Sequence, residues 1–468
     1  MSMDLAGARE LMTSPGGTSN SGVVAVAKAV EVKPSASPVR GSLFRQVLSP
    51  ETALYQSVVS LADQTVSSAT NFLTGVIIAR ACSKEELGLY MLGFSLILLM
   101  TEFQTSLITT PYMVYAPRLS GRAHALYTGS TLIHQLAFCL VTMLGVMCGA
   151  FAVTSGVGPR GLGPVLWALV LVIALIMLRE HARRVSFARM RLKTAFLFDT
   201  FIAVGQVSGL LVLGRFGLLS ASRAYWVVGL VCGIAVLGWL WSDRGFYDPR
   251  ISESLADLKK NWILGRWIFA SGLVWAVSVN LYPWLLAAFH GVASTGVWGA
   301  CLGVASVGNP VLQGIQNLAG PKISHEYAAK GARAMHRLVF KITAVIGTVM
   351  SLLCLVMSIW GGRLLTLLYG HQYAGNSLIV VLLALNLLVT GTAFSFSRAL
   401  FAIDRADVDF LVNFTALFIM VTLGLWLVRA FGTTGAAFGL LGANFATSAV
   451  RIGVFLRLSV GTPAVRDT

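Results

Sequence analysis

Apolar stretches separated by short polar connections follow one another from residue 53 to residue 456. A helix needs about 20 consecutive apolar residues to cross a bilayer, and it satisfies its own backbone polar groups there. The pattern therefore predicts an all-α polytopic membrane protein with about 12 transmembrane helices. The first six spans are expected at Ala53–Ala79, Gly88–Met113, Tyr127–Val153, Leu162–Leu178, Ala195–Leu213 and Ala224–Trp241. The other six are expected at Trp267–Phe289, Val297–Gly314, Val339–Trp360, Ser377–Phe401, Leu411–Val428 and Ala436–Leu456.

A longer polar connection after the sixth span divides the chain into two sets of six. Within it, Ser252, Leu255 and Leu258 predict a short capped helix lying along the membrane surface. The expected organisation is a disordered cytoplasmic segment (1–44), a six-helix bundle (45–241), a cytoplasmic linker (242–266), a second six-helix bundle (267–456) and a cytoplasmic tail (457–468).

Two short motifs occur at matching places in the two halves. Gly88-Leu89-Tyr90 opens the second span, and Gly296-Val297-Trp298 opens the eighth. Phe216-Gly217 precedes the sixth span, and Phe431-Gly432 precedes the twelfth. An even number of helices in each half requires a parallel repeat, related by an axis along the membrane normal.

Basic residues predict the orientation. If the N-terminal segment is cytoplasmic, 28 of the 35 Lys and Arg residues fall on the cytoplasmic side. Such an excess sets topology by the positive-inside rule, so both termini are expected in the cytoplasm. The formal net charge of +16 lies in these membrane loops, where it serves topology and contacts anionic lipid, so nucleic-acid binding is not expected.

Polar side chains recur at helical spacing in four of the spans, in equivalent places of the two halves. Stripes at intervals of three and four residues share one helix face, and together they predict a shared water-filled cavity. The alternative to a cavity is close helix packing by small polar residues. For the carboxylates Asp63 and Glu102, the alternative is that each forms a buried structural pair. The stripes are Gln56, Ser60, Asp63, Ser67, Asn71 and Thr74; Ser95, Glu102, Thr105 and Thr109; Ser271, Trp275, Ser278 and Tyr282; and Ser306, Asn309, Gln313 and Gln316.

The densest basic run extends from Arg179 to Arg191 and is predicted to be a cytoplasmic loop. It serves topology, or alternatively it binds lipid headgroups or a diphosphate, because guanidinium groups bind phosphate in a bidentate manner. The six cysteines are scattered and form no metal-ligand or disulfide pattern, so no metal and no cofactor is expected.

Several motifs in the first 190 residues resemble the polysaccharide-biosynthesis flippases, the oligosaccharide flippase branch of the multidrug/oligosaccharidyl-lipid/polysaccharide (MOP) exporter superfamily. Cys82-Ser83-Lys84 departs from the Leu-Gly-Pro turn that relatives usually have. The matching motifs are Asp63-Gln64, Asn71-Phe72-Leu73-Thr74-Gly75, Ala79-Arg80, Glu85-Glu86-Leu87-Gly88-Leu89-Tyr90, Thr109-Thr110-Pro111 with Pro117-Arg118, and the block from Arg179 to Ala188.

The resemblance implies two six-helix bundles around a central cavity in a bacterial inner (cytoplasmic) membrane. It implies transport of a polyprenyl-diphosphate-linked oligosaccharide to the outer leaflet by alternating access. The partners implied are this lipid-linked substrate, membrane lipids, and the polysaccharide polymerase and glycosyltransferases of the same pathway. Candidate cavity residues are Asp63, Gln64, Asn71, Glu102, Tyr282, Asn309 and Gln313, and candidate basic residues at the cavity mouths are Arg80, Arg118, Arg266 and Arg398.

Two other functions stay open at this point. A cation-coupled multidrug antiporter of the same fold would need carboxylates and aromatic rings for an apolar cation. A membrane-embedded polysaccharide polymerase or ligase would need a sizeable outer loop with catalytic residues, yet the longest outer loop covers only residues 361–376. We therefore expect a transporter and no enzyme, with no catalytic residues.

Overall fold

The computed structural model describes residues 53–403 and 405–460, with a few side chains left out, among them those of Gln56, Ser271 and Trp275. The predictions for residues 1–44, and for the tail after residue 460, lie outside this part. No strand occurs among the described residues. The helices of the first half are α2 (Ala53–Ala81), α3 (Lys84–Gln104), α4 (Thr110–Tyr115), α5 (Gly121–Thr154), α6 (Leu162–Ala188), α7 (Leu192–Arg215) and α8 (Ala221–Asp243). Those of the second half are α9 (Ile251–His290), α10 (Val292–Ala305), α11 (Asn309–Tyr369), α12 (Ser377–Ala402), α13 (Ala406–Ile419) and α14 (Leu425–Val460).

These helices account for the twelve predicted spans. The described residues contain nine continuous helical stretches that are long and apolar enough to cross a membrane. Two of these stretches each supply two spans, because the chain reverses at Gly331 (φ 75°) and at Gly432 (φ 56°). The remaining span is α2, along which polar residues recur. The predicted fold class is therefore confirmed: this is an all-α, multi-pass membrane protein.

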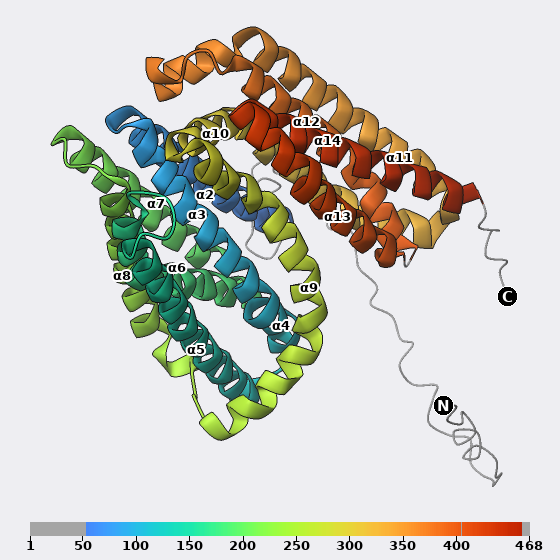
Figure 1. Cartoon of the computed structure of the whole chain (residues 1–468). Helices are drawn as coiled ribbons and strands as arrows, with labels where there is room; N and C mark the ends of the chain where they lie inside the picture. Colours follow the sequence, from blue (N-terminus) through green and yellow to red (C-terminus); the bar gives the residue numbers. More distant parts are fainter. Residues whose placement is uncertain (1–52, 404, 461–468) are drawn as a thin grey trace, which may run out of the picture. The chain divides into compact units, whose positions relative to one another are not determined.

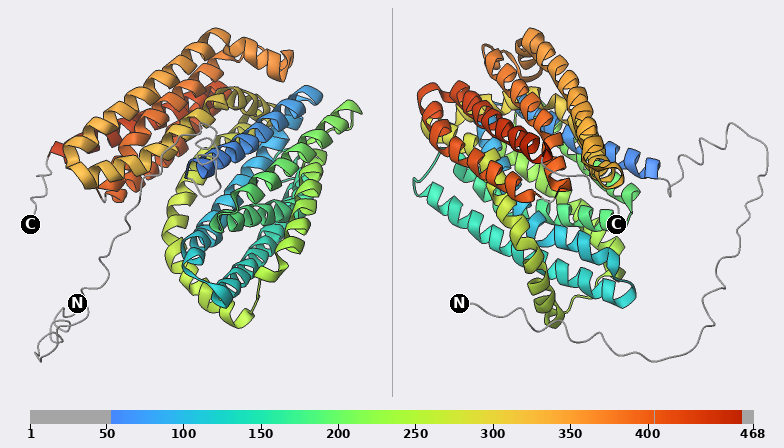
Figure 2. Two further views of the ribbon diagram at one scale, coloured as in Figure 1. Left: turned by 180° about the vertical axis from the view of Figure 1, so that it is seen from behind. Right: turned by 90° about the vertical axis from the view of Figure 1, so that its right-hand side faces the viewer.

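The helices of residues 56–468 form two bundles, coloured blue to green and yellow to red in Figure 1, and Figure 2 gives two further views of them. In the first half α6 is central, and its Leu169, Val172 and Ile173 are fully buried. Large apolar side chains such as Val141 and Leu237 are exposed at the periphery. In a membrane this outward apolar surface faces lipid tails, so its exposure carries no hydrophobic cost.

The linker helix is longer than predicted. Instead of a separate short helix, α9 continues without a break from Ile251 into the seventh span. Its polar Ser254 and Asn261 are buried against α5, where Asn261 Oδ1 accepts a hydrogen bond from Tyr127 Oη at 2.8 Å. Ile251 and Leu255 are exposed on this segment, an arrangement that suits a helix at a membrane surface.

The basic run also differs from the prediction. Helix α6 continues to Ala188, so the connection to α7 begins at Arg189 rather than at Arg179. The expected loop is thus mostly helical. The physical reason is tertiary, because the arginines in this last part of α6 find carboxylate partners on neighbouring helices.

The matching glycines occupy corresponding structural positions. Helices α3 and α10 cross at Gly88 and Gly296. A Cβ atom on Gly88 would lie 2.0 Å from the Val292 carbonyl oxygen, and one on Gly296 would lie 2.1 Å from that of Lys84. Gly217 and Gly432 both have a left-handed backbone, with φ of 65° and 56°. These reciprocal positions are those that a two-fold repeat would produce.

Candidate functional site

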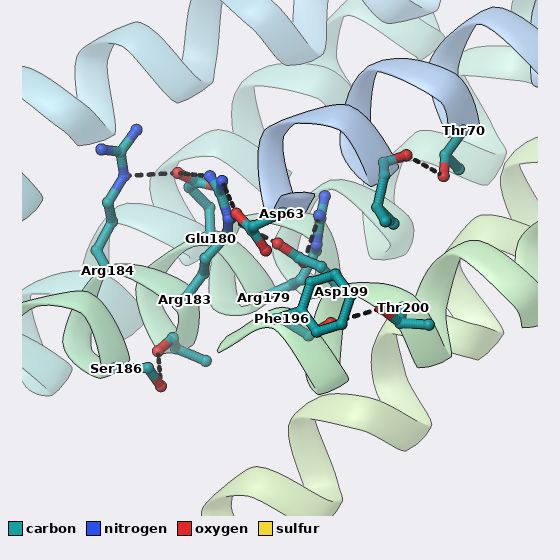
Figure 3. Close-up of polar contacts among 12 residues, drawn as sticks. Asp63, Thr70, Arg179, Glu180, Arg183, Arg184, Ser186, Phe196, Asp199 and Thr200 are labelled. Carbon is teal, nitrogen blue, oxygen red and sulfur yellow. Dashed lines mark hydrogen bonds and ion pairs between the residues drawn. The ribbon is translucent and has the colours of Figure 1, made fainter. Parts of the chain in front are cut away.

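A cluster of ion pairs lies inside the first half, where α2, α6 and α7 meet (Figure 3). Arg183 of α6 donates a hydrogen bond to Asp63 of α2 at 2.5 Å and pairs with Asp199 of α7 at 2.6 Å. Arg179 donates to Asp199 at 2.6 Å. One turn along α6, Arg184 donates to Glu180 at 2.7 Å. The two aspartates are almost fully buried, with 1% and 2% of their surfaces exposed.

The cluster balances three carboxylates with the guanidinium groups of three arginines. Burying a carboxylate costs much free energy unless a partner and hydrogen bonds compensate it. The structure therefore places Asp63 in a buried pair within the first half, and this carboxylate is not directed into a space between the halves. Asp199 was missed in the sequence analysis. Its position inside the fifth predicted span was the available signal, because a carboxylate at membrane depth needs a partner.

The two halves are joined at the end where α2 finishes and α3 begins, which we call the Arg80 end. Arg80 Nε donates to the Leu368 carbonyl at 2.9 Å, and a second N–H of its guanidinium donates to the Leu367 carbonyl. In return, Gln372 donates to the Ala79 carbonyl at 2.8 Å. Arg80 thus binds the exposed carbonyl groups at the end of α11, and it also lines a surface pocket of about 580 Å³. The Gly88–Gly296 crossing lies at this same end.

Other candidates on α2 and α3 lie in different surroundings. Gln64 and Asn71 are exposed on α2, on a different side of the helix from buried Asp63. Glu102 is half-buried on α3 and faces α9, where a Cβ atom on Gly272 would lie 2.5 Å from its Oε1. The polar stripe of α2 therefore divides between a buried side and an exposed side.

Three further candidates are not gathered with the others. Arg118 is exposed after α4, about 6.0 Å from the Tyr115 ring. Arg266 is exposed on α9. Tyr282 is fully buried and packs against Gly424 and Gly439, the latter in the twelfth span.

Arg398 and Gln313 line the same pocket at the opposite end of the second half, which we call the Arg398 end. They line a pocket of about 560 Å³ together with Gln316 and Phe394. The Arg398 guanidinium lies 4.7 Å from the centre of the Phe394 ring and 5.5 Å from that of Phe401. Among the described residues Arg398 forms no ion pair.

Asn309 lines a second pocket, of about 400 Å³, inside the second half. This pocket also receives Asn386 from α12, Asn413 from α13 and Asn444 from α14. The three added asparagines were not singled out from the sequence. Each is a lone amide in an apolar span, and the side chain of such a residue usually forms a hydrogen bond to a neighbouring helix. Only the tertiary structure brings the four together.

Comparison with known proteins supports the fold. No protein-family model matches the chain. The capsular polysaccharide biosynthesis protein CapF of Staphylococcus aureus is 20% identical over 222 residues, which cover 47% of this chain and 56% of that protein. The chain thus spans about half the length of this curated relative.

Two solved structures share most of the architecture. An inward-facing multidrug-resistance MATE-family transporter of the MOP superfamily aligns with a TM-score of 0.69, at 12% identity, over 84% of this chain and 94% of its own. The lipid II flippase MurJ, in an inward closed conformation, aligns with a TM-score of 0.64, at 14% identity, over 86% of this chain and 90% of its own. At these identities the likeness shows the fold. The chain is a multi-pass membrane protein with the helical fold of MOP-superfamily transporters.

Proposed function

We propose that this protein is a flippase that moves a polyprenyl-diphosphate-linked oligosaccharide from the inner to the outer leaflet of a bacterial cytoplasmic membrane. The observation that carries the proposal is the distribution of charge. Asp63 and Asp199 are neutralised by arginines of the same chain, whereas Arg398 lines a pocket and pairs with no carboxylate of the described residues. A substrate path with paired carboxylates and an arginine in its pocket suits an anionic headgroup better than a cationic one.

The diphosphate would first contact the Arg398 end. A guanidinium offers up to five N–H donors in a planar fork, which matches phosphate oxygens, and the carboxamides of Gln313 and Gln316 can donate further hydrogen bonds. The lipid tail would stay among the tails of the bilayer while the sugar and the diphosphate cross. The substrate, membrane lipids, and the polymerase and glycosyltransferases of the pathway are the partners that this function requires.

Alternating access needs two conformations, and the contacts between the halves support an assignment of this one. With the orientation that the basic residues predict, the joined Arg80 end faces outward and the Arg398 end faces the cytoplasm. The path would then be closed to the outside, ready to receive a substrate from the inner leaflet. Movement to the other state would separate Gly88 from Gly296.

A cation-coupled multidrug antiporter is the second candidate, and Glu102 favours it. This carboxylate is half-buried on α3, without an ion pair among the described residues. An apolar cation could be bound there. In the flippase, the same group is the candidate for coupling to a proton or cation gradient.

Removing the gene tests the choice between the two. Loss of a flippase should leave the lipid-linked oligosaccharide complete but trapped on the inner leaflet. Surface polysaccharide should fall while undecaprenyl-linked intermediates accumulate, and drug susceptibility should change little. Complementation with the wild-type gene is the control. Sensitivity to cationic drugs with polysaccharide intact, or failure to build the lipid-linked sugar, would contradict the proposal.

Orientation requires a separate measurement. Reporter fusions after Arg191 and Lys260 should report cytoplasm, and fusions after Lys84 and Tyr373 should report the outside. A consistent reversal would place the joined Arg80 end in the cytoplasm and would invert the proposed state of the transporter.

A further inference from the structure

The asparagine-lined pocket of the second half has the composition of a binding site for an uncharged, hydroxyl-rich group. Its lining comes from all six helices α9–α14, and it includes the four asparagines together with Ser278. No charged side chain is among the lining residues. Its volume of about 400 Å³ falls within the range of small-molecule sites, which is about 300–1,000 Å³.

The amides of this pocket are only partly used within the protein. Asn444 Nδ2 donates to Asn386 Oδ1 at 2.7 Å, which leaves the Nδ2 of Asn386 without a partner among the described residues. Asn309 is exposed, and its side chain makes no hydrogen bond to a described residue. Arg451 donates to Asn413 Oδ1 at 3.2 Å and so orients that amide. Each amide has two donors and one acceptor oxygen, so the donors of Asn309 and Asn386 are the ones that no described residue uses.

Bonds between helices account for three of these asparagines, since Asn444 bonds to Asn386 and Arg451 bonds to Asn413, but they do not account for Asn309. The Asn386–Asn444 bond joins α12 to α14, as polar residues in membrane bundles commonly do. The side chain of Asn309 bonds to no other helix in the described part of the chain. Val279 and Leu302 also line this pocket and expose apolar surface, with 46% and 38% of their surfaces accessible. Amides next to open apolar surface match a sugar ring, which presents hydroxyl groups and C–H faces together.

We propose that this pocket binds a neutral monosaccharide unit of the transported substrate; the assignment rests on the proposed flippase function. A cation would require a carboxylate and a phosphate would require a guanidinium, and neither lines the pocket. The diphosphate at the Arg398 end and the sugar in this pocket would then be recognised by separate parts of the second half.

Protection from thiol labelling tests the pocket in the purified full chain. A Val279→Cys variant is made in a Cys148→Ser background, because Cys148 is the exposed cysteine of the described part. The detergent must lack a sugar headgroup, which would otherwise compete. The probes are glucose, galactose and N-acetylglucosamine. At ten times the Kd, a bound sugar should slow maleimide labelling about tenfold. Gln313→Cys, outside the lining, should be labelled equally with and without sugar.

Substitutions then assign the binding to the amides. Asn386→Leu should raise the sugar concentration needed for half-maximal protection by about two- to tenfold for each hydrogen bond lost. Asn309→Ala alters an exposed residue, so it provides a second measurement if Asn386→Leu does not fold. The matched control is Asn280→Ala, because Asn280 donates to the Ala276 carbonyl of its own helix, bonds to no other described residue and is outside the lining. It should keep full protection.

Three results of the labelling test would overturn the inference. The first is protection by tetraethylammonium or inorganic diphosphate instead of sugars, and the second is no protection by any of the three sugars. The third is that sugars protect Asn386→Leu, Asn309→Ala and the parent equally. Normal transport in a variant that no longer binds sugar would also remove the pocket from the substrate path, although the flippase proposal would stand. Conversely, sugar protection in the purified protein, with no trapped lipid-linked intermediate in the deletion strain, would support the pocket and refute the flippase.

Discussion

The crossing of α3 and α10 provides the sharpest prediction about how the halves move. Replacing Gly88 with Ala, or Gly296 with Ala, places a methyl group where the backbones of the two helices touch. We expect either substitution to weaken the joined state at the Arg80 end and to populate a state in which this end is open.

The size of the effect follows from the geometry. The new Cβ would lie 2.0 Å from the Val292 oxygen in the first variant and 2.1 Å from the Lys84 oxygen in the second. Optimal contact between non-bonded heavy atoms is near 3.5 Å, so the helices must separate by about 1.5 Å. The clash involves backbone atoms, which no change of rotamer can relieve. Overpacking of this kind costs about 1–3 kcal/mol, which shifts a two-state equilibrium by about 5- to 150-fold.

Spin labels on the two halves can measure this shift. Phe216 and His371 are exposed residues at the Arg80 end, one on each half. Double electron–electron resonance between labels at these sites should show a longer-distance population in both variants. Gly145→Ala is the matched control, since a Cβ atom there meets nothing within 4 Å. It should leave the distances unchanged and increase helix stability slightly. Distances and unfolding temperatures like those of the control in both crossing variants would refute the reasoning.

The remaining predictions concern the charges and the polar side chains. Arg183→Met should lower the free energy of unfolding by about 3–5 kcal/mol, because it leaves buried carboxylates without their partner. Adding Asp63→Asn should restore part of the lost stability. Thermal unfolding of the purified single and double variants measures the two effects. Cysteines replacing Gln64 and Gln313 should react with a water-soluble maleimide, whereas a cysteine replacing Asp63 should not; equal reactivity at the three sites would contradict the burial described above. Arg398→Ala should reduce surface polysaccharide while Arg398→Lys retains part of it, because lysine keeps the charge but loses the planar fork. Both variants must first be shown to insert in the normal topology, and full activity of Arg398→Ala would exclude this residue from the path.

The presence of the helices could be predicted from the sequence, because it depends on the transfer of each apolar segment from water into lipid. Every span except α2 is apolar over its own length, and the backbone bonds of a helix are internal. The two chain reversals within long helical stretches also agree with the predicted spans. Gly331 and Gly432 lie between predicted spans and adopt the positive φ that glycine permits. The glycines at positions 88 and 296, from which the sequence analysis predicted a repeat, lie at the crossing of α3 and α10.

The composition of each site depended on contacts between distant segments. The spacing of polar residues along α2 predicted one cavity-facing stripe, yet Asp63 is buried toward α6 and α7 while Gln64 and Asn71 are exposed. Sequence periodicity identifies residues that share a side of a helix, but it does not say which neighbour that side contacts. In the same way, the basic run gave no sign that Arg183 would pair with a carboxylate 120 residues earlier in the chain.

The sequence by itself thus determined that this chain crosses the membrane about twelve times in two similar halves, because insertion depends on the residues within each span. Only the tertiary structure decided which polar groups are neutralised and which stay available. Asp63 is compensated by Arg183, whereas Arg398 lies over two aromatic rings and pairs with no carboxylate among the described residues. Burial makes an unpaired charge costly, so the helix packing that supplies or withholds a partner determines whether a charged residue holds the fold together or can bind a ligand.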